Sequence, residues 1–330
     1  MKIFVTGATG YVGNALALKL ANDGHNVNIL VRDSSSKNIP VHQGIHVFEG
    51  DITNRGTLVR AMQQCQQVYH TAALVKLWAK DKNQFYRVNV EGTENVLAVA
   101  LQTGVKKLVF TSTCGVLGAS LKEPLTEDDP RIKAFDNEYE FTKSIAESLV
   151  RKYAQNGLST VIVSLSKVFG PGIETHPISV NQLTKKFIEG KLTFIPKPGS
   201  LISNFCFIDD IVRGHLLAMD KGMDGEKYIL GGANISYTDF FETIRKITFS
   251  TARLVEAPKW CAKVFAAMYW LKQRLTGNDL FFTVRGVNHV YCDKAFSSGK
   301  AVDHLGYQPT AIKDALEQTI NFLKTTSHEQ

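Results

Sequence analysis

The chain of 330 residues lacks the features that mark several large classes of protein. Its five cysteines lie far apart, with no CxxC pair and no Cys/His spacing, so the sequence predicts neither a disulfide framework nor a metal site. No segment reaches the roughly 18 apolar residues that a membrane span needs. MKIFVTGATG is too short for the apolar core of a signal peptide. We therefore expect a cytoplasmic protein.

The chain also lacks a block of like charge. Its net charge of +7 comes from 38 Lys and Arg against 31 Asp and Glu, and these residues are spread along the sequence. A basic block is typical of an arm that binds nucleic acid, so we expect no nucleic-acid partner. A mildly basic surface suits small anionic ligands instead.

Short apolar runs alternate with amphipathic stretches up to about residue 165. Runs of four to six apolar residues are typical of strands buried on both faces, and the amphipathic stretches are typical of helices that cover them. The alternation predicts a doubly wound α/β domain with a parallel sheet. The expected strands are KIFVTG, NVNILV, HVFEGD, QVYHTAA, KLVFTST and STVIVSLS.

The alternation loosens after FGPG at 169–172. We therefore predict a first domain over residues 1–165 and a smaller domain over 166–330. The segment 205–222 has the pattern of a late strand followed by a helix, and we expect it to rejoin the first domain. No internal repeat or long linker separates the two parts, so close packing between them is expected.

The stretch TGATGYVG places Gly7, Gly10 and Gly13 directly after the first strand and at the start of a helix. Glycine lets the backbone turn tightly and approach a pyrophosphate, and the helix N-terminus offers free N–H groups. Inside a βαβ pattern this loop predicts a dinucleotide site. The other residues expected to line it are Thr9, Tyr11 and Val12.

The end of the second strand, NILVRDS, bears on the choice of dinucleotide. Folds that prefer NAD(H) place an acid there for the ribose hydroxyls, whereas this chain has Val31 followed by Arg32. A guanidinium can bind a 2′-phosphate through two charge-assisted hydrogen bonds, so we predict NADP(H) as the preferred cofactor. NAD(H) stays open as an alternative, in which Arg32 is solvated and Asp33 binds the ribose.

Two further strand ends are candidates for cofactor contacts. Asp51 ends the third strand in GDIT and is expected beside the adenine. The HTAA motif ends the fourth strand with small residues, which allow backbone close to a cofactor at the switch point of such a sheet. Its candidate residues are Thr71, Ala72 and Ala73.

Hydroxyl, phenol and ammonium groups follow at the end of KLVFTST and in YEFTK. Because ligands of such sheets bind beyond the carboxyl ends of the strands, Thr113, Tyr139 and Lys143 are expected around a nicotinamide. Tyr139 and Lys143 are four residues apart and share a helix face, so the ammonium is expected to lower a phenol pKa of about 10.

These groups have distinct expected roles. Tyr139 exchanges a proton with a carbonyl or alcohol oxygen, and Lys143 tunes the phenol and hydrogen-bonds the nicotinamide ribose. Thr113 holds and polarises the substrate oxygen, with Ser112 as the alternative if the strand register differs by one residue. The spacing Tyr-x-x-x-Lys alone is common, and its position after the glycine loop and the hydroxyl-ended strand carries the prediction.

The sequence resembles the extended short-chain dehydrogenase/reductase family, which includes nucleotide-sugar epimerases, dihydroflavonol 4-reductases and 3β-hydroxysteroid dehydrogenases. The resemblance runs through TGATGYVG, LVRD, GDIT, HTAA, VNVEGTENVL, VFTST, YEFTK, VFGPG, FIDDIVRGHLLAMDKG, YILGG and LGYQPT. VRD and LWAKDKNQFYRVNVEGT resemble the dihydroflavonol-reductase-like branch. The resemblance implies a Rossmann-type sheet and a smaller, mostly C-terminal α/β substrate domain.

The resemblance also implies roles for single residues. It gives the pyrophosphate to the three glycines, the adenosine 2′-phosphate to Arg32, and catalysis to Thr113, Tyr139 and Lys143. Two departures concern Ser164–Ser166, where relatives often have R-P-S, and Phe207, where a His is frequent. Positions implied to line the cofactor are Asp51, Ile52, Ala72 and Val168.

The predicted function is that of an NADPH-dependent reductase that transfers hydride to a ketone or aldehyde of a small organic substrate. One alternative is a nucleotide-sugar epimerase or dehydratase with bound NAD, and another is a non-catalytic dinucleotide-sensing regulator. The resemblance allows a homodimer, and nothing in the sequence excludes a monomer. Leu77 and Trp78 are candidates for the substrate pocket.

The segment KWCAKVFAAMYWLKQRL at 259–275 is basic and amphipathic, with aromatic residues on one side. Such a helix suits a membrane surface or a cover over a lipid-like substrate. Packing against the smaller domain is the simpler interpretation, so we expect no membrane contact.

Overall fold

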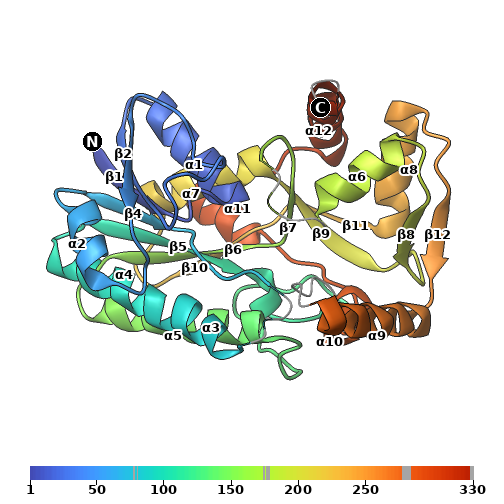
Figure 1. The fold of residues 1–330 in the computed structure, drawn as a ribbon, viewed down its shortest axis with the longest axis horizontal. Helices are drawn as coiled ribbons and strands as arrows, with labels where there is room; N and C mark the ends of the chain where they lie inside the picture. Colours follow the sequence, from blue (N-terminus) through green and yellow to red (C-terminus); the bar gives the residue numbers. More distant parts are fainter. Residues whose placement is uncertain (77–78, 80, 174, 176–178, 277–283, 328–330) are drawn as a thin grey trace.

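The computed structural model describes residues 1–330 except 77–78, 80, 174, 176–178, 277–283 and 328–330. A sheet of seven strands, parallel at every pairing, forms the larger part (Figure 1). Its order is β10-β6-β5-β4-β1-β2-β3. The strands are β1 (Lys2–Thr6), β2 (Asn26–Val31), β3 (Ile45–Glu49), β4 (Gln67–His70), β5 (Lys107–Thr113), β6 (Thr160–Leu165) and β10 (Lys227–Leu230).

The chain reverses its direction across this sheet between β1 and β4. From β1 it proceeds outward to β2 and β3, and it then returns to β4 on the other side of β1. This topology confirms the predicted doubly wound α/β fold. Sheets of this topology bind ligands at such a reversal, in the crevice expected outside the carboxyl ends of β1 and β4.

Helices cover both faces of the large sheet (Figure 1). Strand side chains alternate between the two faces, so Ile3 and Val5 enter one core and Phe4 enters the other. One face carries α1 (Tyr11–Asn22), α7 (Ile208–Lys221) and α11 (Gly299–Leu305). The other carries α2 (Arg55–Met62), α4 (Gly92–Gln102) and α5 (Glu138–Gln155), with the short helical turns α3 (Asn83–Tyr86), η1 (Arg87–Glu91) and η2 (Cys114–Val116).

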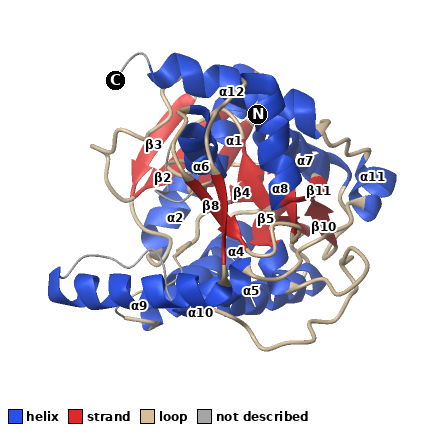
Figure 2. Ribbon diagram, turned by 90° about the vertical axis from the view of Figure 1, so that its right-hand side faces the viewer, coloured by secondary structure: helices blue, strands red, loops and turns tan. Residues whose placement is uncertain are grey.

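A smaller second part has its own core, rich in phenylalanine, and its own two small sheets. One sheet joins β7 (Lys167–Phe169), β9 (Ile202–Phe207) and β11 (Ala233–Ser236), and the other joins β8 (Thr193–Pro196) and β12 (Leu254–Ala257). Figure 2 shows α9 and α10 together at the lower edge of the molecule. The helices here are α6 (Val180–Ile188), α8 (Tyr237–Thr248), α9 (Lys259–Thr276), α10 (Val284–Val290) and α12 (Ile312–Ser327).

The segment 205–222 is divided between the two parts. Its helix α7 packs against β5, β6 and β10 of the large sheet, whereas its strand β9 pairs with β7 and β11. The strand that extends the large sheet is β10, which the sequence did not single out as one. The boundary at 165/166 stays a prediction.

A buried ion pair ties β10 to α5. Lys227 Nζ lies 3.0 Å from Glu147 Oε2, and both side chains are 4% exposed. The second oxygen of this carboxylate accepts a hydrogen bond of 2.6 Å from Ser112 Oγ on β5. The carboxylate therefore joins three elements across one end of the sheet.

We expect the Lys227→Met variant to lose about 3–5 kcal/mol of unfolding free energy, because it leaves the buried Glu147 carboxylate with only the more distant and exposed Arg151, at 3.9 Å, as a cationic partner. Urea unfolding followed by circular dichroism measures this change. The more exposed pair Lys300–Glu226, at 2.6 Å, provides the control. Lys300→Met is expected to cost at most about 1 kcal/mol, and equal losses in the two variants would contradict the interpretation.

Candidate active site

The glycine loop after β1 is packed so closely that side chains have no room. Gly7 has φ +76°, and a Cβ placed on it would lie 2.7 Å from the amide nitrogen of Ala72. A Cβ on Gly13 would overlap the carbonyl oxygen of Gly7. The first turn of α1 therefore rests directly on the loop backbone, and the loop rests on the end of β4.

The N-terminus of α1 is left without a side-chain cap. Its N-cap residue, Gly10, accepts no such bond, and the first turn contains no acidic residue. The uncapped amides and the positive end of the helix dipole suit an anion such as a pyrophosphate, so the loop fits a dinucleotide. By contrast, side chains cap α2, α5, α6 and α8, through Asn54, Asn137, Ser179 and Ser236.

Arg32 and Asp33, the two candidates for the adenosine ribose at the end of β2, have different surroundings. Arg32 is exposed and lines a shallow groove of about 380 Å³ with Glu49, Gly50 and Asp51. Asp33 instead accepts hydrogen bonds from Ser35, at 2.6 Å from the hydroxyl and 2.8 Å from the amide, and these bonds lower its pKa. The Asp33 carboxylate is thus engaged within its own loop, whereas Arg32 faces the groove.

The remaining predicted cofactor residues lie in the segments that directly follow β3 and β4. Asp51 accepts from the amide and hydroxyl of Thr53, both at 2.8 Å, and it lines the groove at Arg32. Thr71 Oγ1 donates to the carbonyl of Thr6 at 2.7 Å, which joins the ends of β1 and β4. Ala72 and Ala73 are half-buried, whereas Ile52 is buried.

Three other predicted residues connect the glycine loop with the second part. Tyr11 donates its hydroxyl to the carbonyl of Gly170 at 2.7 Å, which joins α1 to the FGPG loop. Val12 and Val168 pack against the cores of both parts. Thr9 is half-buried within the turn itself.

The start of α5 sets the position of Tyr139. The side chain of Asn137 caps this helix by accepting from the amide of Glu140 at 2.8 Å. The half-buried Tyr139 is hydrogen-bonded to the side chain of Thr113 at the end of β5. Thr113 Oγ1 already accepts from the amide of Gly115 at 3.0 Å, so its own hydrogen is available to the phenol oxygen. Ser112, the alternative, donates to Glu147 instead.

The environment keeps Tyr139 protonated. Burial, and then the charge of Glu140, raise the pKa of this phenol, whereas the hydrogen bond from Thr113 acts in the opposite direction. The phenol is therefore protonated at neutral pH, and it can give its proton only to a more basic oxygen, such as an alkoxide that forms at a reduced carbonyl. The structure thus places Thr113 and Tyr139 together at the carboxyl end of β5.

Lys143 differs from its expected arrangement. It is 1% exposed, its ammonium donates to the carbonyl of Thr111 at 2.6 Å, and it lies 3.8 Å from the ring centre of Phe110. Burial lowers the pKa of Lys143 to about 7, although the charge of Glu147 acts to raise it. The expectation that Lys143 lowers the pKa of Tyr139 is therefore wrong for this structure, because the ammonium is held at the backbone of β5 and burial dominates at the phenol.

Glu140 is a residue of this site that the sequence did not single out. It is 1% exposed and pairs with Arg131 at 3.0 Å and with His289 at 2.7 Å. Burial acts to raise its pKa, but the hydrogen bond from His289 and the charges of Lys294 and Arg131 lower it to about 2. Arg131 also donates to the carbonyl of Val116 at 3.1 Å. Glu140 therefore connects the start of α5 to the loop after β5 and to α10.

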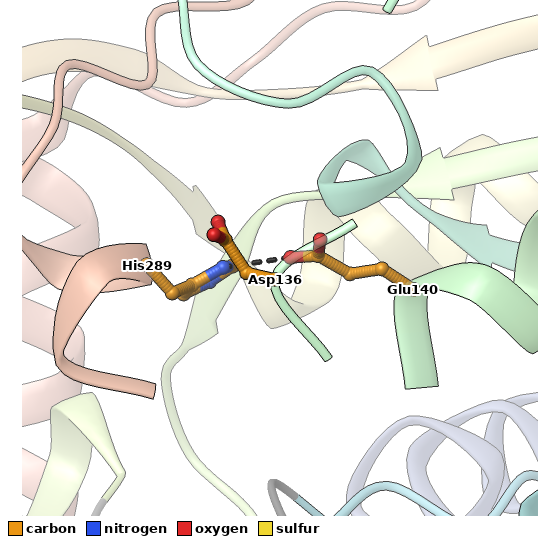
Figure 3. Close-up of side chains that lie close together, drawn as sticks. All are labelled: Asp136, Glu140 and His289. Carbon is orange, nitrogen blue, oxygen red and sulfur yellow. Dashed lines mark ion pairs between the residues drawn. The ribbon is translucent and has the colours of Figure 1, made fainter. Parts of the chain in front are cut away.

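Figure 3 shows Glu140 together with Asp136 and His289. These three residues each offer a ligand atom, and the atoms lie within 4.8 Å of one another. Two cationic side chains, Arg131 and Lys294, also lie within 4.0 Å of the Glu140 carboxylate, at 3.0 and 3.9 Å. Their charges would repel a divalent ion, so we interpret the cluster as an ion-pair network. The candidate pocket residues Leu77 and Trp78 lie outside the described residues.

The chain is similar to known proteins over nearly its whole length. The model of the NAD dependent epimerase/dehydratase family matches residues 3–231. A Synechocystis sp. protein, provisionally named dihydroflavonol 4-reductase, is 31% identical over 331 residues, which cover 97% of this chain and 94% of that protein. A Stigmatella aurantiaca protein named 4-hydroxy-2-methyl-3-oxo-4-farnesyl-3,4-dihydroquinoline-1-oxide ketoreductase is 31% identical over 273 residues, covering 81% and 79%.

Solved structures share the fold. The structure of a UDP-glucuronic acid 4-epimerase from Bacillus cereus, in complex with UDP-glucuronic acid and NAD, has a TM-score of 0.78 to this chain. The match covers 99% of this chain and 100% of the epimerase at 24% identity. At this identity, the similarity concerns the fold alone.

The lowered pKa of Lys143 predicts a pH dependence of stability. The pKa is about 7 in the folded chain and 10.5 for the unperturbed side chain, so the unfolded state binds more protons between these values. Lys143 is therefore expected to make the free energy of unfolding rise with pH between these two values, by about 1 kcal/mol per pH unit.

Urea unfolding of the Lys143→Met variant at several pH values between 7 and 10 tests this. The variant is expected to show a flatter profile than the unmodified chain. Lys294→Met is the matched control, because the pKa of Lys294 is lowered only to about 8 and its contribution begins at higher pH. A Lys143→Met profile parallel to that of the unmodified chain would refute the assignment.

Proposed function

Because the chain belongs to the NAD-dependent epimerase/dehydratase family, whose members are NAD(P)-dependent enzymes acting on alcohol and carbonyl groups, we propose that it is an NADPH-dependent reductase of a ketone or aldehyde. The observation that carries the proposal is the pair formed by Tyr139 and Thr113. The phenol has a raised pKa and a hydrogen-bonded hydroxyl beside it at the carboxyl end of β5. A protonated phenol suits the direction of reduction.

The residues present fit a nicotinamide dinucleotide. The glycine loop and the uncapped amides of α1 would hold the pyrophosphate, and Arg32 would hold a 2′-phosphate at the groove beside Asp51. Ile52, Thr71, Ala72, Ala73 and Val168 would line the crevice. When bound, the nicotinamide supplies the hydride.

The chemistry of the chain's own residues is proton transfer and orientation. When the substrate is bound, the hydroxyl hydrogen of Thr113 turns from the phenol oxygen to the carbonyl oxygen of the substrate, which this hydrogen bond polarises. As the carbonyl carbon gains a hydride, the oxygen takes the phenol proton of Tyr139, and the product is an alcohol. Tyr139 then recovers a proton from solvent. Lys143 is proposed to hydrogen-bond the nicotinamide ribose, for which its ammonium has to leave the carbonyl of Thr111.

The proposed substrate is a small organic carbonyl compound. The relatives named as a dihydroflavonol 4-reductase and as a farnesyl-quinoline ketoreductase support a largely apolar one. A nucleotide-sugar epimerase with bound NAD is the second candidate, and the similarity in fold to an epimerase supports it. The absence of an acid at Val31 favours the reductase over this epimerase.

A regulator without catalysis is the third candidate, and the retained contact between Tyr139 and Thr113 counts against it. A cytoplasmic location, the division into domains at 165/166 and a homodimer are further parts of the proposal that await tests.

The Tyr139→Phe variant is expected to lose turnover by roughly a hundredfold to ten-thousandfold, because no other group replaces the proton donor. Binding of NADPH, followed by its fluorescence, should be unchanged. Tyr86→Phe, at a tyrosine 47% exposed on α3, is the control and should keep full activity. Full turnover in Tyr139→Phe would remove the proposed mechanism.

The Arg32→Ala variant is expected to weaken NADPH binding by tenfold or more, since a charge-assisted hydrogen bond contributes about 1.5–3 kcal/mol. Binding of NADH should change little, because NADH has no 2′-phosphate. Asp33→Asn is the control, and it should leave the affinity for both nucleotides as it is. An equal loss of affinity for NADPH and NADH in Arg32→Ala would argue against the 2′-phosphate contact.

A further inference from the structure

The helix α9 exposes an apolar face to solvent. Trp260, Phe265 and Met268 are 68%, 65% and 67% exposed, and Val264 is also exposed. The sequence interpretation was that this segment packs against the smaller part, and α9 does contact α10 there. Among the residues of α9 whose side chains are described, however, Ala266 is the buried one, so most of the apolar side chains face outward.

The geometry of the helix gathers these side chains. Trp260, Val264 and Met268 follow at intervals of four residues, so they form one row along the helix surface. Lys259 and Lys263 are exposed and precede residues of this row by one position. No Asp or Glu occurs from residue 259 to 276. The face is therefore apolar with basic residues on its flank.

We propose that this face of α9 docks on the surface of an anionic lipid bilayer. An apolar row with tryptophan, bordered by lysines, is the pattern of helices that lie in the interface of a membrane. The aliphatic stems of the lysines can lie on the hydrocarbon while their ammonium groups contact lipid phosphates. The net charge of +7 favours approach to such a surface.

The positive charge of α9 favours an anionic bilayer over a second copy of the chain as the partner of this face. A symmetric pair of α9 helices would bring their lysines near one another, and neither helix has a carboxylate to pair with them. A bilayer that contains phosphatidylglycerol supplies the missing negative charge. Among the described residues, no helix has the length and hydropathy to cross a bilayer, so the contact is peripheral.

The docking face adjoins the candidate active site. α9 packs against α10, and His289 Nδ1 of α10 lies 2.7 Å from the carboxylate of Glu140, the neighbour of Tyr139. A bilayer in contact with α9 would thus lie near the candidate active site. An apolar carbonyl compound dissolved in the lipid could then reach the site from the bilayer. This extension rests on the proposed function, whereas the docking itself does not.

The test is co-sedimentation of the full chain with vesicles made of equal parts phosphatidylglycerol and phosphatidylcholine. Binding is expected to these vesicles and not to pure phosphatidylcholine, and high salt should weaken it. The tryptophan emission of the chain should shift to shorter wavelength on binding, and the Trp260→Ser variant should lose most of this shift. Phe265→Ser and Lys263→Gln are each expected to weaken binding by roughly threefold to tenfold.

Phe249→Ser is the matched control, because Phe249 is 86% exposed at the end of α8, away from the patch. It should bind like the unmodified chain, and circular dichroism checks that all variants fold. No sedimentation with anionic vesicles overturns the proposal, as does binding that Phe265→Ser leaves unchanged. A dimer in light scattering that Phe265→Ser dissociates, without vesicle binding, would assign the face to a second copy instead. NADPH binding is measured separately, so a failure of docking is distinguishable from a failure of the proposed function.

Discussion

The candidate site depends on the contact between the first turn of α1 and the backbone of the glycine loop. Gly13 lies so close to the Gly7 carbonyl that a side chain on Gly13 would push the helix away from the loop, and a side chain on Gly7 would push the loop away from Ala72 after β4. This contact places the uncapped N-terminus of α1 at the point where the chain reverses between β1 and β4. An anion-binding helix end and a crevice in the sheet thereby coincide.

Burial determines the protonation of the groups on α5. Tyr139 and Lys143 are neighbours on the helix, yet desolvation shifts both toward their neutral forms, with the phenol pKa raised and the ammonium pKa lowered to about 7. Glu140 stays charged because Arg131 and Lys294 lie beside it and His289 hydrogen-bonds it. The same helical turn thus presents a protonated phenol to Thr113 at the end of β5 and a network of charged side chains to the C-terminal segment.

Short sequence patterns predicted much of the fold. The parts that depend on contacts between residues far apart in the chain could not be predicted in this way. The glycine loop, the strand ends and the start of α5 are set by short-range chemistry that can be read in the sequence. The pairing of β10 with β6 and of β9 with β7 depends on register between segments far apart in the chain. The sequence did not indicate a role for Glu140 either. Its partner His289 lies about 150 residues further along the chain, and the spacing to Arg131 forms no recognisable motif.

Lys143 shows the same limit at the level of one side chain. Its spacing from Tyr139 correctly predicted that both residues lie on one helix. The spacing could not show that the ammonium hydrogen-bonds the carbonyl of Thr111 on β5.

The most direct test of the account follows the hydride of NADPH that is deuterated at its transferable position, with apolar ketones as substrates. Mass spectrometry should find one deuterium in the alcohol for each NADP⁺ formed. A chain that carries stoichiometric bound NAD, interconverts a nucleotide sugar and transfers no deuterium from added NADPH would contradict it.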